Sequence, residues 1–127
     1  MGTKMQESKV RDVKFEKKAM SAAMRFLALR GYELIDEEWA HEQDVPVIVA
    51  KQDDCIVFTE VVARKGKEKG MQQEKADDGM RARAEKLAMD FLSVHDYVEV
   101  SLRFDVINLV ALAQDRALIR HHINALG

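Results

Sequence analysis

A cluster of basic residues in the middle of the chain has the chemistry to contact phosphate. Four cations follow one another with a single acid, Glu68, between them, and two arginines come soon after: Arg64, Lys65, Lys67 and Lys69, then Arg81 and Arg83. Lysine and arginine neutralise backbone phosphates without reading bases, and no aromatic residue is interleaved to stack on a base. The pattern predicts either weak, sequence-independent nucleic-acid binding or an ordinary solvated run of charges.

Two smaller groups of reactive side chains are candidates for a metal site or a nucleophile. His121 and His122 are adjacent, so in a strand they point to opposite faces, and no cysteine or paired carboxylate lies nearby in sequence to complete a metal site. Cys55 follows Asp53 and Asp54, whose negative charges oppose formation of a thiolate. We therefore expect no metal site at the histidines and a structural role for the cysteine.

Length and composition limit the class of protein. The chain has 127 residues, 47% of them hydrophobic and 33% charged, with one proline and one cysteine, as in one folded domain of a reducing compartment. The net charge of −2 provides no global attraction for nucleic acid. No uncharged apolar run approaches the roughly 18 residues of a membrane span, so we expect a cytoplasmic protein without a membrane partner. Residues 1–12 are predicted to be a flexible tail and residues 13–127 a single domain.

Hydrophobic periodicity predicts the elements that position these residues, beginning with a helix and a hairpin. Apolar residues recur at helical spacing over Val13–Arg30, and Gly31 is expected to end that helix in the left-handed conformation. The chain then turns into residues 32–35. Two β-branched segments, 45–50 and 56–63, are separated by a short polar turn, which predicts an antiparallel hairpin.

The second half of the chain completes a mixed pattern of helices and strands. Residues 64–75 contain two glycines and four lysines without apolar periodicity, which predicts an exposed loop. An apolar stripe predicts a helix over 75–94, and an alternating and then continuous apolar segment predicts strand structure over 98–112. Periodicity does not choose between strand and helix for residues 117–125. The order predicts an α/β fold, a three-layer-like sandwich with a central mixed β-sheet flanked by helices.

Several motifs, in order and almost without gaps, carry a resemblance to a known family over residues 19–125. They are Ala22-Ala23, Phe26-Leu27, Arg30-Gly31-Tyr32, Leu34-Ile35, Trp39, Ile48-Val49-Ala50, Val57-Phe58-Thr59-Glu60-Val61, Ala88 with Leu92, Arg103-Phe104-Asp105-Val106 and Ile119-Arg120-His121-His122-Ile123-Asn124-Ala125. The chain thus resembles the YraN-type family, which is similar in fold to restriction-endonuclease-like and Holliday-junction-resolvase-like nucleases. The resemblance implies a restriction-endonuclease-like fold.

The resemblance also implies a type of active site and shows where this chain departs from it. In such nucleases a carboxylate on one hairpin strand and a Glu-x-Lys on the next hold Mg²⁺, which assists attack of water on a phosphodiester. Here the two acids expected on the first strand align with Val45 and Val47, the lysine with Val62, and a helical glutamate with Met20. Of this set only Glu60 is retained. The four replacements favour apolar burial against neighbours or a partner.

We therefore expect an endonuclease-like protein that has lost metal-dependent nuclease activity, with no catalytic residue, no metal and no cofactor. Three kinds of partner remain open: DNA or another nucleic acid bound weakly, another protein, and a second copy of the chain in a homodimer. One alternative is an active Mg²⁺-dependent endonuclease or resolvase that uses rearranged acids from an acidic run, of which Asp44 is the first candidate despite its strand parity. The run is otherwise expected to be a solvated loop. Another is a homo-oligomeric scaffold. Glu60 itself is either a relic metal ligand or a strand-end acid paired with Arg64 or Lys51. The acidic run consists of Asp36, Glu37, Glu38, Glu42 and Asp44.

Overall fold

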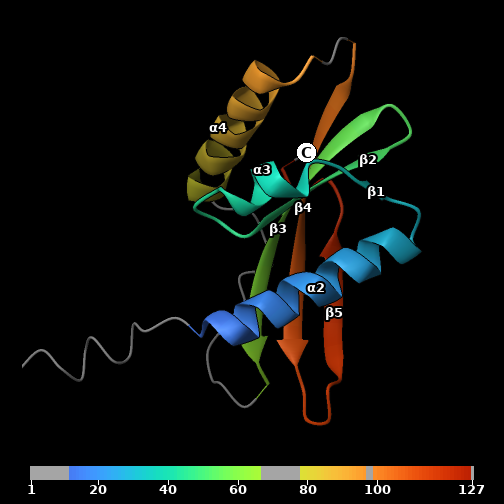
Figure 1. Cartoon of the computed structure of the whole chain (residues 1–127), viewed down its shortest axis with the longest axis vertical. Helices are drawn as coiled ribbons and strands as arrows, with labels where there is room; N and C mark the ends of the chain where they lie inside the picture. The colour runs from blue at the N-terminus through green and yellow to red at the C-terminus, as the bar shows by residue number, and fades with distance from the viewer. Residues whose placement is uncertain (1–11, 67–77, 97–98, 127) are drawn as a thin grey trace, which may run out of the picture.

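The computed structural model describes residues 12–66, 78–96 and 99–126, which are coloured in Figure 1. In chain order the elements are α2 (Val13–Leu29), β1 (Glu33–Leu34), α3 (Glu37–His41), β2 (Val47–Gln52), β3 (Cys55–Lys65), α4 (Asp78–Val94), β4 (Ser101–Ala111) and β5 (Ala117–His122). The strands form one mixed sheet in the order β1-β2-β3-β4-β5, antiparallel except for the central parallel pair β3–β4. This is the predicted α/β fold with a mixed sheet flanked by helices, consistent with a restriction-endonuclease-like fold.

The helix α2 forms where the sequence supplies a signal at each end. The Asp12 side chain accepts a hydrogen bond from the Phe15 backbone N–H at 3.0 Å, which satisfies one of the unpaired donors of the first turn. Gly31 has a φ of 88°, the left-handed conformation predicted for it. Asp12 was assigned to the flexible tail and is instead the helix cap, while residues 1–11 of that tail lie outside the described residues.

Alternation along the strands gives each face of the sheet its own apolar core. On one face Leu27 of α2 packs in a cluster with Val57 and Ile107. On the other face Phe91 of α4 packs edge-on against Phe58, with ring centroids 5.5 Å apart. Figure 1 shows α2 crossing the strands, whereas α4 lies toward the other end of the view. Each fully buried large apolar side chain contributes roughly 1.5–3 kcal/mol, so the two helices are held by their apolar stripes.

The second half of the chain follows the predicted order with shifted bounds. The helix α4 begins at Asp78, and residues 75–77 of the predicted helix lie outside the described residues. The predicted strand over 98–112 is a single strand, Ser101–Ala111, and residues 117–122 are a strand because they pair antiparallel with β4. Across the part of the chain that the structure describes, no helix has the length and apolar character needed to cross a membrane.

Two predictions are wrong at the edges of the hairpin. The acidic run was expected to be a loop, but it contains the short helix α3, whose cap Asp36 accepts a hydrogen bond from the Trp39 backbone N–H at 3.0 Å. Arg64 and Lys65 were expected to open a loop, but they belong to β3, because the parallel ladder with β4 extends to the pair Lys65–Ala111. Residues 67–75 of the predicted loop lie outside the described residues.

Candidate functional site

The residues aligned with the nuclease positions come together along one groove. Val47 of β2 lies directly opposite Glu60 of β3 in the antiparallel register, and Val62 follows on the same face of β3. Met20 of α2 and Val45, just before β2, line the same groove. The structure therefore brings all five positions to one groove, and the strand pattern predicts this for Val47, Glu60 and Val62. It stays a prediction that four of these positions have lost the family's functional residues and that Glu60 is a relic metal ligand.

The Glu60 carboxylate is held by an arginine from α4. Arg83 donates from Nε to Oε1 at 3.0 Å and from Nη2 to Oε2 at 3.1 Å, a bidentate pair. The Glu60 side chain is 14% exposed and the Arg83 side chain 41% exposed. The partner of Glu60 is therefore Arg83 rather than Arg64 or Lys51, the two partners expected from sequence. Each carboxylate oxygen accepts one charge-assisted hydrogen bond, so the guanidinium neutralises the acid and competes with a metal ion for it.

The surface around this pair is largely apolar. Val47 is 2% exposed and packs in the core beneath α4, and Val45 and Val62 are half-buried. Mg²⁺ needs several oxygen ligands, which valine cannot supply. Among the described residues, no group of three or more histidine, cysteine, aspartate and glutamate side chains is placed to hold a metal ion. Asp44, the candidate for a rearranged acid, is exposed and lines the groove.

The predicted phosphate-contacting cations do not form one exposed patch in the part of the chain described here. The Lys65 Nζ atom pairs with Asp12 Oδ2 at 3.0 Å, which ties the end of β3 to the start of α2. Arg81 is exposed and donates to the Leu126 carbonyl at 3.4 Å, whereas Arg83 is committed to Glu60. Arg64 is half-buried within β3. Lys67 and Lys69 lie outside the described residues, and nucleic-acid binding by this set stays a prediction.

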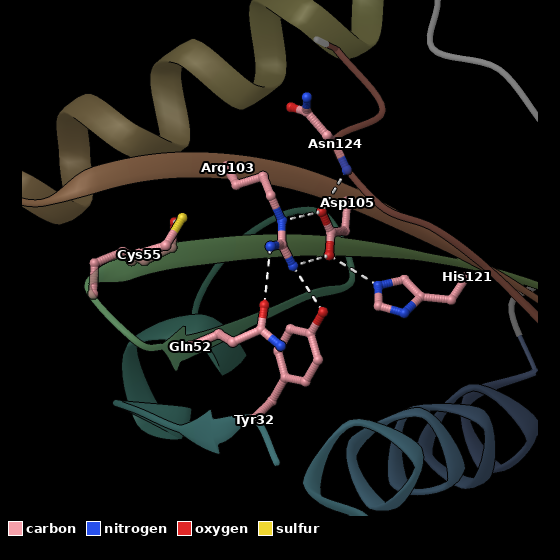
Figure 2. Close-up of polar contacts among 8 residues, drawn as sticks. Tyr32, Gln52, Cys55, Arg103, Asp105, His121 and Asn124 are labelled. Atoms are coloured by element: carbon pink, nitrogen blue, oxygen red, sulfur yellow. Dashed lines mark hydrogen bonds and ion pairs between the residues drawn. The ribbon is translucent and has the colours of Figure 1, made fainter. Parts of the chain in front are cut away.

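A second polar cluster lies on the opposite face of the sheet and was missed from sequence (Figure 2). The Asp105 side chain is fully buried and accepts from Arg103 Nε and Nη2, both at 2.9 Å. It also accepts from His121 Nε2 at 2.8 Å and from the Asn124 backbone N–H at 2.9 Å. Arg103 reaches further, to the Tyr32 hydroxyl at 2.7 Å. The cluster joins β4, β5, the turn after β5 and the residue before β1.

Electrostatics keeps the buried Asp105 ionised. Burial alone raises the pKa of its carboxyl, but the hydrogen bonds from His121, Arg103 and the Asn124 backbone outweigh burial and lower that pKa below its usual value. The same carboxylate raises the pKa of the Arg103 guanidinium. Because Asp105 already accepts four hydrogen bonds, it has no lone pair left for a metal or a proton transfer, and the cluster is structural. The only sequence signal for it was the Arg-x-Asp spacing, which places both side chains on one strand face.

The remaining candidate side chains take local roles. Burial raises the pKa of the half-buried Cys55 thiol, in agreement with a structural role. His121 faces Asp105, and its ring packs edge-on against Phe26 and Tyr32 with centroids 5.9 and 5.8 Å away. His122, the next residue of β5, points to the other face. The two adjacent histidines therefore do not share a site.

Comparison with known proteins adds the relatives of the chain. The family model described as "Uncharacterised protein family UPF0102" matches residues 20–109. A UPF0102 protein from Roseiflexus castenholzii is 39% identical over 101 residues, which cover 78% of this chain and 82% of that protein. A UPF0102 protein from Myxococcus xanthus is 32% identical over 100 residues, or 79% of each chain. A third, from Parafrankia, is 29% identical over 103 residues, covering 81% of this chain and 87% of its own length.

Proposed function

The chain belongs to the uncharacterised protein family UPF0102, the YraN-type family that its motifs resemble, and we propose that it is an endonuclease-like protein without metal-dependent nuclease activity. In this proposal the groove that would hold Mg²⁺ and a phosphodiester in an active nuclease serves as a binding surface. Glu60 acts as an ion-pair partner and not as a metal ligand. A cytoplasmic location stays part of the proposal.

One observation carries this proposal: the only retained acid of the implied ligand set is engaged by Arg83 and faces a valine. The bidentate contact occupies both oxygens of Glu60, and Val47 stands directly opposite, where the family implies a second carboxylate. A single carboxylate already neutralised by a guanidinium attracts Mg²⁺ poorly, because a dehydrating divalent cation needs several anionic oxygens. Among the described residues, the aligned positions therefore lack the grouped carboxylates that would assemble metal, water and phosphate.

The test is metal binding by calorimetry followed by a cleavage assay. We expect no binding heat for Mg²⁺ or Mn²⁺ at millimolar concentration. We also expect no cleavage of linear, branched or single-stranded DNA above a preparation of Glu60→Ala. Glu85→Ala, which removes an exposed acid from α4, is the matched control for loss of one negative charge. Cleavage that is lost in Glu60→Ala and kept in Glu85→Ala would refute the proposal and favour an active nuclease with rearranged acids. Asp44→Ala would then be the next variant.

Weak nucleic-acid binding is a second proposed property, favoured by the exposed Arg81 and by the run of cations in the sequence that contains Lys65. If four cations each met one phosphate of duplex DNA, log K would fall with log salt by about 0.9 per contact, or roughly 3 to 4 in total. Replacing Lys65 and Lys67 by glutamate should weaken binding to all sequences alike. Absence of any retardation of duplex, branched or single-stranded DNA near 50 mM salt would refute this property and leave the protein-interaction and homodimer readings.

A further inference from the structure

The strand β3 is longer than its neighbour β2, which leaves part of one strand edge facing the groove. The β2–β3 ladder ends at the pair Val47–Glu60, followed by one hydrogen bond from the Val61 N–H to the Pro46 carbonyl at 2.9 Å. On its other side β3 stays paired with β4 as far as Lys65. Within the part of the chain that the structure describes, the last residues of β3, after Val61, therefore have a partner strand on one side only.

Alternation along β3 identifies the backbone groups on this open edge. Val61 bonds toward β2, and the residues of even number bond toward β4, as the Gly66 N–H does to the Ala111 carbonyl at 2.7 Å. In a strand, both backbone groups of one residue point to the same neighbour. The N–H and C=O of Ala63 and Lys65 therefore point to the open edge, where the Lys65 C=O accepts a long hydrogen bond from Arg64 Nη1 at 3.4 Å and no described backbone group pairs with Ala63.

The groove runs along this edge and is larger than a small-molecule pocket. Its walls include Val61 and Ala63, which face α2, and Glu60 and Val62, which face α4. Side chains of both sheet faces can border one groove only if it follows the strand edge. Its volume is about 1410 Å³, above the roughly 300–1,000 Å³ typical of small-molecule sites. These dimensions suit an extended chain segment.

The charge of the groove selects among possible occupants. Its described lining contains more acids than cations: Asp12, Glu16, Glu37, Asp44 and Glu60 against Lys17 and Arg83, with His41 beside them. Two of these charges cancel in the Glu60–Arg83 pair, Asp12 is paired with Lys65 of β3, and Glu37 and Asp44 are exposed at the rim. An acidic rim repels a phosphodiester backbone and attracts lysine or arginine. A second copy of this chain seated edge to edge would place acids opposite acids.

We propose that this groove binds an extended, basic and apolar segment of a partner protein, which adds as a short strand to the free edge of β3. Ala63 and Lys65 pair with the backbone of the segment, its apolar side chains contact the valine-lined wall, and its cations meet Glu37 and Asp44. Strand addition of this kind takes its affinity from main-chain hydrogen bonds and its specificity from the flanking side chains. The inference rests on the proposed function, because a groove loaded with metal and phosphate would exclude the segment.

The experiment uses a defined peptide, acetyl-Lys-Val-Lys-Val-Lys-Val-amide, titrated into the whole ¹⁵N-labelled protein. We expect the backbone amide signals of Ala63 and Lys65 to shift and their hydrogen exchange to slow, while the Val62 amide, which points to β4, changes less. The same peptide with glutamate in place of lysine should bind at least tenfold more weakly. A peptide with N-methyl groups on alternate residues, which removes half of its edge donors, should also bind weakly.

Two double charge reversals of equal net charge separate the effect of the groove acids from a general effect on folding or charge. Glu37→Lys with Asp44→Lys should weaken binding of the lysine peptide by about tenfold at low salt, since each exposed charge pair adds a small amount. Glu38→Lys with Glu42→Lys alters the net charge equally, at exposed residues of α3 and its C-cap that lie outside the groove, and should leave binding unchanged. Ala63→Pro removes one edge-facing N–H without touching the β4 ladder and should also weaken binding.

The outcomes separate this inference from the proposed function. Peptide binding without the Ala63 and Lys65 shifts, or binding equally weakened by both charge-reversal pairs, would overturn the strand-addition site. Shift of the same amides by duplex DNA would overturn it in favour of nucleic acid, and a concentration-dependent dimer that protects these amides would favour a second copy. Metal-dependent DNA cleavage would refute the proposed function. Absence of both cleavage and peptide binding would refute the inference alone.

Discussion

The substitution Asp105→Asn should destabilise the fold more than any other single change at a charged residue described above. Asparagine keeps the volume but loses the charge, and its amide NH₂ would face the donors of Arg103 or His121 in place of an oxygen. The Asp105 side chain is fully buried and the Arg103 side chain 18% exposed, so the guanidinium would be left without its anion. Removing one member of a buried ion pair costs roughly 3–5 kcal/mol.

That loss is a large share of the 5–15 kcal/mol typical of a native domain. For a chain of this size each kcal/mol moves the unfolding midpoint by about 3–5 °C, so the variant should melt about 10–20 °C lower. The pH dependence has a definite sign. The folded pKa of Asp105 is lowered, so its stabilisation is complete above the unfolded pKa of roughly 3.9 and is lost as pH falls through the folded pKa. The difference between wild type and variant should therefore be constant above about pH 5 and shrink in acid.

Urea unfolding followed by circular dichroism at pH 7 and in acid measures both effects. Asp115→Asn is the matched control, because it removes an exposed acid at the turn leading into β5, paired with Lys18 at 2.7 Å, in a left-handed conformation that asparagine also adopts. The control should unfold at the wild-type midpoint. A loss below about 1 kcal/mol for Asp105→Asn, or a difference between wild type and variant that grows in acid, would show that the cluster does not hold the sheet together.

Three further predictions follow from other contacts. Gly31→Ala should lower the free energy of unfolding by about 1 kcal/mol in a denaturant titration, because φ is positive there, and an unchanged midpoint would contradict the left-handed cap. A double-mutant cycle of Glu60→Ala and Arg83→Ala should give a coupling near 1 kcal/mol, and additivity would mean the ion pair contributes nothing. Cys55 should react slowly with a thiol reagent until the pH is well above 8.5, and rapid reaction at pH 7 would show that its thiol pKa is not raised.

Local sequence signals predicted the parts of the fold that depend on neighbours in sequence. The end of α2 at Gly31 could be predicted because a positive φ there favours glycine. The opposition of Val47 and Glu60 followed from the length of the hairpin turn and the period of two along each strand. The gathering of Val47, Glu60 and Val62 needed only this register, whereas Met20 reaches the groove through the packing of α2 on the sheet.

Features that depend on distant segments could not be predicted in the same way. The partner of Glu60 comes from α4, 23 positions later, and no local pattern favours Arg83 over nearer cations. The strand β5 was undecided because a short apolar run fits either state until pairing with β4 fixes it. The helix α3 was missed because its five residues carry no apolar period, only a capping aspartate. The Asp105 cluster brings together residues from three regions of the chain, and their meeting requires the whole sheet.

The parallel pairing of β3 with β4 at the centre of the sheet sets the order in which the protein can fold. The antiparallel pairs β2–β3 and β4–β5 each close across a few residues, so each forms on the microsecond scale of a hairpin. The pair β3–β4 can form only after the connecting segment from Gly66 to Val100 has brought its two ends together. The conformational entropy of closing this loop is lost before any hydrogen bond of the ladder forms. We therefore expect the joining of two preformed hairpins to limit the folding rate. Substitutions in the β3–β4 ladder should slow folding, whereas those in α4 should mainly speed unfolding.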